Sequence, residues 1–142
     1  MTKEEFDAAV AAAKSSNPIW FEAEREAPAS ADAILGLEAR LSAKLPAEYV
    51  DFIARYGAGP FAFALVLGVQ PGTGWELIEH ARNVPAHFVP ASDAETGDYY
   101  GFIVKNGVCE GCIAVWDHED GSVLDGQYAN FYEMLAARAL QP

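Results

Sequence analysis

The chain has few basic residues for its length. Lys and Arg together number 9 among 142 residues, against 21 Asp and Glu, and the formal net charge at pH 7 is −12. Such a charge repels phosphate backbones and anionic lipid headgroups, which disfavours direct binding to nucleic acid or to a membrane surface. The same field would speed the capture of a basic partner, although solubility alone is an equally good reason for the excess of acid.

Cysteine and long apolar runs are also scarce. Two cysteines, Cys109 and Cys112, are fewer than a disulfide framework usually carries. The longest apolar stretch, Phe61 to Val69, is far shorter than the roughly 20 residues of a membrane helix. Acidic residues lie between Met1 and Asp7, where an export signal needs a positive segment followed by an apolar run. We therefore expect a soluble protein of the cytoplasm.

Common catalytic motifs are missing as well. Gly72-Thr73-Gly74 lacks the third glycine of a dinucleotide-binding loop, because position 77 is Leu, and it lacks the Lys-Ser/Thr of a phosphate loop. The chain contains no Gly-x-Ser-x-Gly sequence. We expect no enzymatic activity, no catalytic residue and no cofactor.

One C-x-x-C sequence, Cys109-Glu110-Gly111-Cys112, could be half of a zinc site or a redox pair. A zinc site needs four ligands, and His80, His87 or His118 would have to complete it. A redox pair gains its reactive thiol at a helix N-terminus, whereas Ile113 to Trp116 read as a strand. The pattern favours a coincidence on a hairpin and no metal site, and leaves open whether the two cysteines pair.

A second cluster, Asp117-His118-Glu119-Asp120, has the composition of a divalent-metal or acid–base site. Adjacent side chains of a strand point to opposite faces, so consecutive residues do not readily converge on one ion. We interpret the segment as a solvated turn. A hydrolase or metal enzyme that uses His118 is a hypothesis that ranks far behind the two binding functions given below. Metal analysis of the purified protein would test it.

What the chain does contain is a packed core. Hydrophobic residues make up 51% of it and aromatic residues 12%. The length predicts one structural domain, with residues 1–30 as an N-terminal helix and linker that pack on a main body of residues 31–142.

Periodicity and turn residues predict the elements. In the helix that starts at Pro46, the residues Tyr49, Phe52, Ile53 and Tyr56 form one apolar stripe that ends at Gly57. The other expected helices span about Lys3 to Lys14, Asp32 to Ala43 and Phe131 to Ala139, with a short one inside Trp75 to Asn83. The expected strands are Phe61 to Leu67, His87 to Ala91, Tyr99 to Val104 and Cys112 to Asp117.

An ordered series of motifs carries a family resemblance. It consists of the Leu45-Pro46 helix, the turn Gly57-Ala58-Gly59-Pro60, Gly97-Asp98 with Gly101-Phe102, Asp117-His118-Glu119, and a closing helix from Phe131. From about Ile34 to Leu135 the chain resembles the SUKH superfamily, which includes fungal Knr-type cell-wall regulators and bacterial immunity proteins. It departs from the family pattern where Tyr56-Gly57-Ala58-Gly59 replaces Asn-Gly-Gly, and where Cys112 replaces a common proline.

The resemblance implies an α+β fold, with an antiparallel sheet flanked by N-terminal helices and a C-terminal helix, and no enzymatic activity. Bacterial members commonly bind and neutralise polymorphic toxins, often nucleases. A nuclease presents a basic groove, which an acidic protein can occupy. The hypothesis is an immunity protein for a basic toxin domain; the alternative is a regulatory or scaffolding domain for an endogenous client.

Carboxylates and exposed aromatic rings are the side chains that such a contact would use. The candidate contact residues are Trp75, Glu76, Glu79, Asp93, Glu95, Asp98, Tyr99, Asp117, Glu119 and Asp120. For Asp98 a turn role through local backbone bonds is the better interpretation, and for Trp75 a partly buried core role.

Overall fold

The computed structural model describes residues 1–142 and contains five α-helices, two short 3-10 helices and seven strands. In chain order they are α1 (Lys3–Ser16), η1 (Pro18–Phe21), α2 (Ala31–Leu41), α3 (Ala47–Arg55), β1 (Gly59–Phe61), β2 (Ala64–Val66), α4 (Leu77–His80), η2 (Ala81–Asn83), β3 (Phe88–Asp93), β4 (Tyr99–Lys105), β5 (Val108–Cys109), β6 (Ile113–Trp116), β7 (Val123–Tyr128) and α5 (Phe131–Ala139). None of the helices is long and apolar enough to cross a membrane.

All strands belong to one antiparallel sheet in the order β1-β2-β3-β4-β6-β7, with β5 paired to β4 outside this path. The α+β class and the antiparallel sheet are as predicted. The single strand predicted from Phe61 to Leu67 is wrong, because the segment is the hairpin β1-β2. Ala62 adopts φ +48° at its turn, and Phe61 pairs with Ala64.

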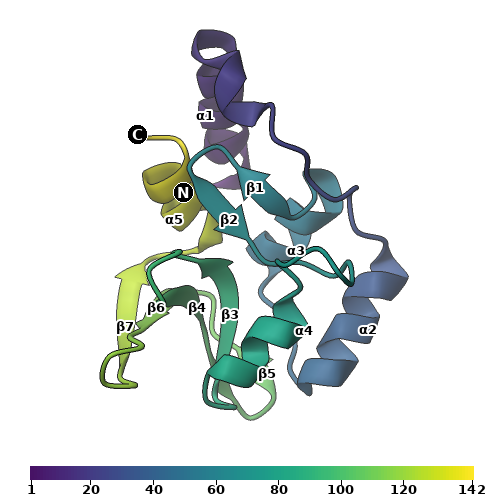
Figure 1. Ribbon diagram of the computed structural model, residues 1–142, viewed down its shortest axis with the longest axis vertical. Helices are drawn as coiled ribbons and strands as arrows, with labels where there is room; N and C mark the ends of the chain where they lie inside the picture. The colour runs from purple at the N-terminus through teal and green to yellow at the C-terminus, as the bar shows by residue number, and fades with distance from the viewer.

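The sheet gains a strand that the sequence did not predict, β7, at the edge next to β6. The positive φ of the β4–β5 turn comes from Asn106 and Gly107, one of the two turns predicted for this hairpin. Figure 1 shows β3, β4, β6 and β7 together in the lower left of the molecule, with α1 and α5 above them and α2 beside α4 on the right.

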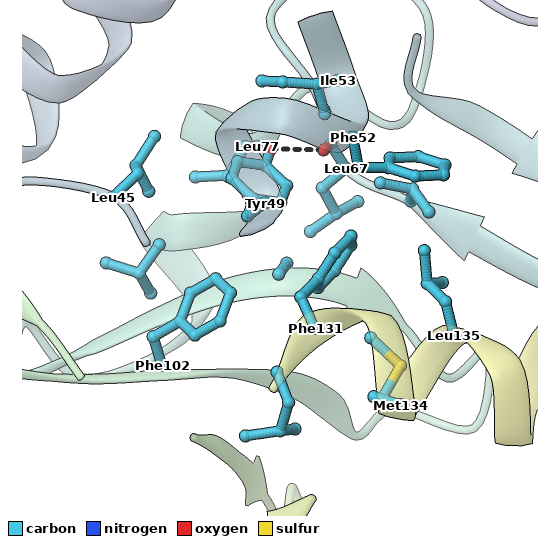
Figure 2. Close-up of a cluster of buried hydrophobic side chains, with 14 of the residues drawn as sticks. Leu45, Tyr49, Phe52, Ile53, Leu67, Leu77, Phe102, Phe131, Met134 and Leu135 are labelled. Carbon is cyan, nitrogen blue, oxygen red and sulfur yellow. Dashed lines mark hydrogen bonds between the residues drawn. The ribbon is translucent and has the colours of Figure 1, made fainter. Parts of the chain in front are cut away.

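One hydrophobic core joins the helices to the sheet. The α3 stripe is buried as predicted, since Tyr49, Phe52 and Ile53 are all fully buried. Figure 2 shows Tyr49 above Phe102 of β4 and Phe131 of α5, and both rings meet Tyr49 edge-on. The Tyr49 hydroxyl donates to the carbonyl of Leu67 over 2.6 Å, so the polar atom of this ring is satisfied inside the core.

The N-terminal helix shares this core. Phe6 of α1 is fully buried and stacks on Tyr132 of α5. At the surface, the guanidinium of Arg55 pairs with both Asp51 of its own helix and Asp7 of α1, at 2.7 and 3.0 Å. The carboxylate pair raises the pKa of Arg55 and holds that of Asp7 below its usual range.

Helix starts follow the side chains that can cap them. Ser30 accepts the Ala33 N–H at the start of α2, and Asn130 accepts the Glu133 N–H at the start of α5. Glu133 completes no reciprocal capping box, since its carboxylate accepts from Ala129. Pro46 is the N-cap of α3 rather than its first helical residue, with ψ 146°.

Candidate functional site

Two turns lie side by side at one end of the sheet, the β3–β4 turn and the β6–β7 turn. They meet because β4 pairs with β6, which sets Tyr99 opposite Trp116. Asp98 of the first turn accepts the backbone N–H of His118 in the second over 3.0 Å and contacts its Nδ1 at 2.6 Å. The sequence interpretation placed the bonds of the Asp98 side chain on the backbone of its own turn. In the structure this side chain instead ties the two turns together.

Gly97 makes this approach possible. It adopts φ +102°, and a Cβ at this position would lie 2.7 Å from the His118 ring. The ring and Asp98 shift each other's protonation: the carboxylate raises the pKa of His118, and the hydrogen bonds from His118 lower the pKa of Asp98. The contact is a charged tether at the surface.

Six of the predicted contact residues gather on these turns, and we call them the strand-end surface: Asp93, Glu95, Asp98, Asp117, Glu119 and Asp120. Three of their carboxylates shape the turns by accepting N–H groups two residues ahead, from Asp93 to Glu95, Asp117 to Glu119 and Asp120 to Ser122, at 2.7 to 2.9 Å. Glu95 and Glu119 are exposed, and their carboxylates accept no hydrogen bond. The surface therefore keeps free carboxylates beside structural ones.

The segment of the chain that contributes the strands and turns at this end of the molecule has almost no lysine or arginine. Between residues 83 and 137 the sequence contains nine Asp and Glu but one basic residue, Lys105. Lys105 lies at the C-terminal end of β4, whereas the strand-end surface lies at its start, and it is paired with Glu110 at 2.9 Å. Arg138 of α5 lines one hollow together with Asp93 and Glu95, but no carboxylate of the strand-end surface forms an ion pair with a lysine or arginine, so the surface keeps a net negative charge.

The two aromatic residues predicted for the contact are used by the fold. Tyr99 is only 7% exposed, and its hydroxyl lies 2.7 Å from Nδ1 of His80. Trp75 is half-buried against Gly59 and donates its indole N–H to Glu26 over 3.1 Å. Neither ring is presented as an anchor, which agrees with the core interpretation given for Trp75.

The remaining predicted residues, Glu76 and Glu79, lie around α4. Glu76 is 3.9 Å from Arg40 of α2, and Glu79 pairs with Arg82 at 2.9 Å. Both carboxylates thus have an arginine within 4 Å, whereas those of the strand-end surface have none and are approached only by His118, beside Asp98, and His80, beside Asp93. The structure separates the predicted set into one acidic group without an arginine or lysine ion pair and one pair of carboxylates that each have one.

The acidic turn also brings potential metal ligands together. Oxygen atoms of Asp98 and Asp117 and a ring nitrogen of His118 lie within 4.8 Å of one another. The solvated turn interpreted for this segment is confirmed, and the alternation of strand side chains, which would keep neighbours apart, does not apply to Asp117 and His118. Hydrogen bonds within the turns already account for this arrangement, through Asp98 with His118 and Asp117 with the Glu119 N–H.

The two cysteines are free thiols. Burial raises the pKa of Cys109 to about 11, and burial together with a 3.4 Å hydrogen bond to Asp125 raises that of Cys112. A raised pKa keeps a thiol protonated and unreactive at neutral pH, the reverse of a redox pair. Cys109 ends β5 and Cys112 directly precedes β6, so both lie on a hairpin, as predicted from the C-x-x-C sequence.

Comparison with known proteins identifies the family. A family model described as SMI1-KNR4 cell-wall, of the SUKH group, matches residues 31–135. The chain belongs to the SUKH family. Its fold is similar to that of a crystal structure of a protein from Pseudomonas syringae pv. tomato, with a TM-score of 0.68, 15% identity, and coverage of 96% of this chain and 99% of the other. No curated protein matches the SUKH chain described here.

The match agrees with the resemblance carried by the Leu45-Pro46 helix and the later glycine motifs. Its bounds begin at the first residue of α2 and end within α5, so α1 and the linker lie outside the family model. The similar crystal structure, in contrast, is aligned over nearly the whole chain, which shows that the fold extends beyond the family model.

Proposed function

We propose that this SUKH protein is a non-enzymatic binding module, an immunity protein that neutralises a basic, nuclease-type toxin inside the cytoplasm of the cell that makes it. The observation that carries the proposal is the strand-end surface, where six carboxylates gather and none lies within 4 Å of a lysine or arginine nitrogen, with Arg138 of α5 as the one such cation beside Asp93 and Glu95. A nuclease binds a polyanion through a basic groove, and a surface of opposite potential can cover that groove.

Opposite charges on the two proteins would make the binding of the toxin fast. Complementary charge raises association rate constants from about 10⁵–10⁶ M⁻¹s⁻¹ towards 10⁸ M⁻¹s⁻¹ or more at low salt. A toxin that enters a cell acts on each target it reaches, so fast capture matters as much as tight binding. The free carboxylates of Glu95 and Glu119 are suited to pair with Arg or Lys side chains of the toxin, and the turn carboxylates add to the field.

The test is rescue by co-expression. A toxin domain encoded beside this gene is expressed alone, where it should stop growth, and then with this chain, where growth should return. The triple variant Glu95→Gln, Glu119→Gln, Asp120→Asn should rescue less well. Asn at position 120 keeps an oxygen that can accept the Ser122 N–H, so the turn is preserved.

A matched control removes the same charge elsewhere. Glu4, Glu22 and Glu24 are exposed residues of α1 and the linker, and changing all three to Gln removes the same number of negative charges. This control should rescue like the parent chain. Equal rescue by both triples would contradict a role for the strand-end surface, and a client without toxic activity would favour a regulatory SUKH domain instead.

A further inference from the structure

An uncovered part of the sheet lies next to the strand-end surface. Tyr100, Val115 and Leu124 are opposite one another on β4, β6 and β7, so their side chains share one face. The same face carries Phe102 into the core below α5, two residues along β4. Beyond α5, however, Tyr100 and Val115 are half-buried and Leu124 is 54% exposed. The core-facing side of the sheet thus emerges at the surface.

A pair of tyrosines occupies this uncovered face. The rings of Tyr100 and Tyr128 lie 6.2 Å apart between centroids, and Tyr128 is also half-buried. The face continues past α5 to Phe63, in the β1–β2 turn, which is 50% exposed. Tyrosine is enriched, with tryptophan and arginine, among the residues that contribute most of the binding energy at protein interfaces. Together, Tyr100, Val115, Leu124 and Tyr128 form what we call the tyrosine face.

The tyrosine face already holds one guanidinium. The Arg138 side chain of α5 lies over the Tyr100 ring, 5.3 Å from its centroid, and makes no ion pair. The ring of Tyr128 has no cation over it. Carboxylates stand beside the face, because Asp93 and Glu95 line one hollow together with Tyr100 and Arg138. An aromatic ring inside a negative rim is suited to a positively charged side chain.

We propose that the tyrosine face is the anchor point for an arginine-bearing segment of the protein partner, with one guanidinium over Tyr128 and an apolar neighbour on Leu124. The proposal rests on the immunity function and adds where the partner inserts side chains. A second copy of this chain does not fit this role, because two molecules of net charge −12 repel each other. Arginine satisfies both features of the face, since its plane stacks on a ring while its N–H groups pair with carboxylates.

A second apolar surface provides the natural comparison. The groove between α2 and α3 has a volume of about 490 Å³ and is lined by Ile34, Leu35, Leu45 and Val50 among others. Leu35 is 62% exposed there, close to the 54% of Leu124. The charged residues that line this groove are one Glu38 and one Lys44, so it offers no charge preference for a basic segment.

The first experiment measures the dissociation constant of the complex with the toxin domain. Tyr128→Ser and Leu124→Ser should each weaken binding by about 10-fold or more. Tyr128→Phe keeps the ring and should bind as tightly as the parent, and Leu35→Ser is the matched exposed-leucine control. Thermal unfolding of each variant verifies that it is folded. Unchanged binding by Tyr128→Ser and Leu124→Ser, or a loss caused by Leu35→Ser alone, would overturn the assignment.

The second experiment needs no toxin. A capped peptide of alternating Arg and Val is titrated into the ¹⁵N- and methyl-labelled chain, and its analogue with citrulline in place of arginine serves as the uncharged control. Saturable shifts at Tyr100, Leu124 and Tyr128 that vanish with Tyr128→Ser and with citrulline are expected. Shifts in the α2–α3 groove, or shifts spread over all carboxylates and unaffected by Tyr128→Ser, would refute the proposal.

The two experiments also separate the two proposals. Binding of the peptide at the tyrosine face without any rescue from toxin would leave this anchor point standing while the immunity function fails. Rescue of growth by the Tyr128→Ser and Leu124→Ser variants as well as by the parent would leave the immunity function standing and remove the anchor point.

Discussion

A single buried carboxylate fastens the linker before α2 to the body of the protein. Glu26 is 6% exposed, and its side chain accepts the N–H of Val69 over 3.1 Å, that of Gln70 over 3.3 Å and the indole N–H of Trp75 over 3.1 Å. Its backbone N–H also donates to Ala58. Replacing Glu26 by Ala removes the acceptor for all three donors while the main-chain bond can remain.

The cost follows from where the donors lie. A hydrogen bond to a charged group contributes about 1.5–3 kcal/mol when buried, and less where water can replace it. Val69 and Trp75 are half-buried and Gln70 is exposed, so the first two donors lose about 1 kcal/mol each and the third little. With the packing lost around the side chain, Glu26→Ala should lower the free energy of unfolding by about 2–3 kcal/mol. For a chain of this size, that corresponds to a Tm lower by about 6–9 °C.

Thermal unfolding by circular dichroism and unfolding in urea measure this change. Glu24→Ala, an exposed carboxylate of the same linker, is the control and should stay within about 0.5 kcal/mol of the parent. Glu26→Gln should fall between the two, because its amide oxygen can still accept from one donor. A Glu26→Ala protein as stable as the Glu24→Ala control would refute the role given to this carboxylate.

Three smaller predictions test other parts of the structure. Tyr49→Phe should cost about 1–1.5 kcal/mol in urea unfolding, because it leaves the buried Leu67 carbonyl without its donor; an unchanged midpoint would contradict this. Ala62→Gly should raise the free energy of unfolding by about 0.5 kcal/mol, since Ala62 has φ +48°, and a lower Tm would be the opposite result. The Asp98–His118 tether should stabilise the protein most between about pH 4 and pH 6.5. The raised pKa of His118 means that this stability is lost as the pH rises through it, and the lowered pKa of Asp98 that it is lost as the pH falls through that value. NMR titration of His118 should give a midpoint that falls in Asp98→Asn, and a midpoint unmoved by that substitution would exclude the tether.

Much of the helical part could be predicted because local signals and burial agree there. The spacing of Tyr49, Phe52 and Ile53 required one buried face, and all three are buried. The β1–β2 hairpin could not be predicted, since large and small residues alternate through a turn at Ala62 as they would in a strand. Strand β7 contains Asp125 and Gly126, residue types that are depleted in strands, and its sequence does not alternate between apolar and polar residues.

The candidate site divides in the same way. Charge alone pointed to the carboxylates between residues 93 and 120, but only the pairing of β4 with β6 brings Asp98 to His118. Which of Tyr99 and Tyr100 is buried, and which is exposed for a contact, depends on which face of β4 meets the helices. A shift of one residue exchanges the two faces, so the sequence could not decide it. The structure buries Tyr99 and leaves Tyr100 half-exposed.

The central claim is that the strand-end surface captures a basic protein, and the association rate constant tests it most directly. Stopped-flow mixing with the toxin domain, from about 0.05 to 1 M salt, spans Debye lengths from more than 10 Å to about 3 Å. The association rate constant of the parent chain should fall steeply as the salt concentration rises. The triple variant of Glu95, Glu119 and Asp120 should have a smaller rate constant at low salt and a weaker dependence on salt. A rate constant that does not depend on salt, or that is the same for the triple variant, would contradict the account.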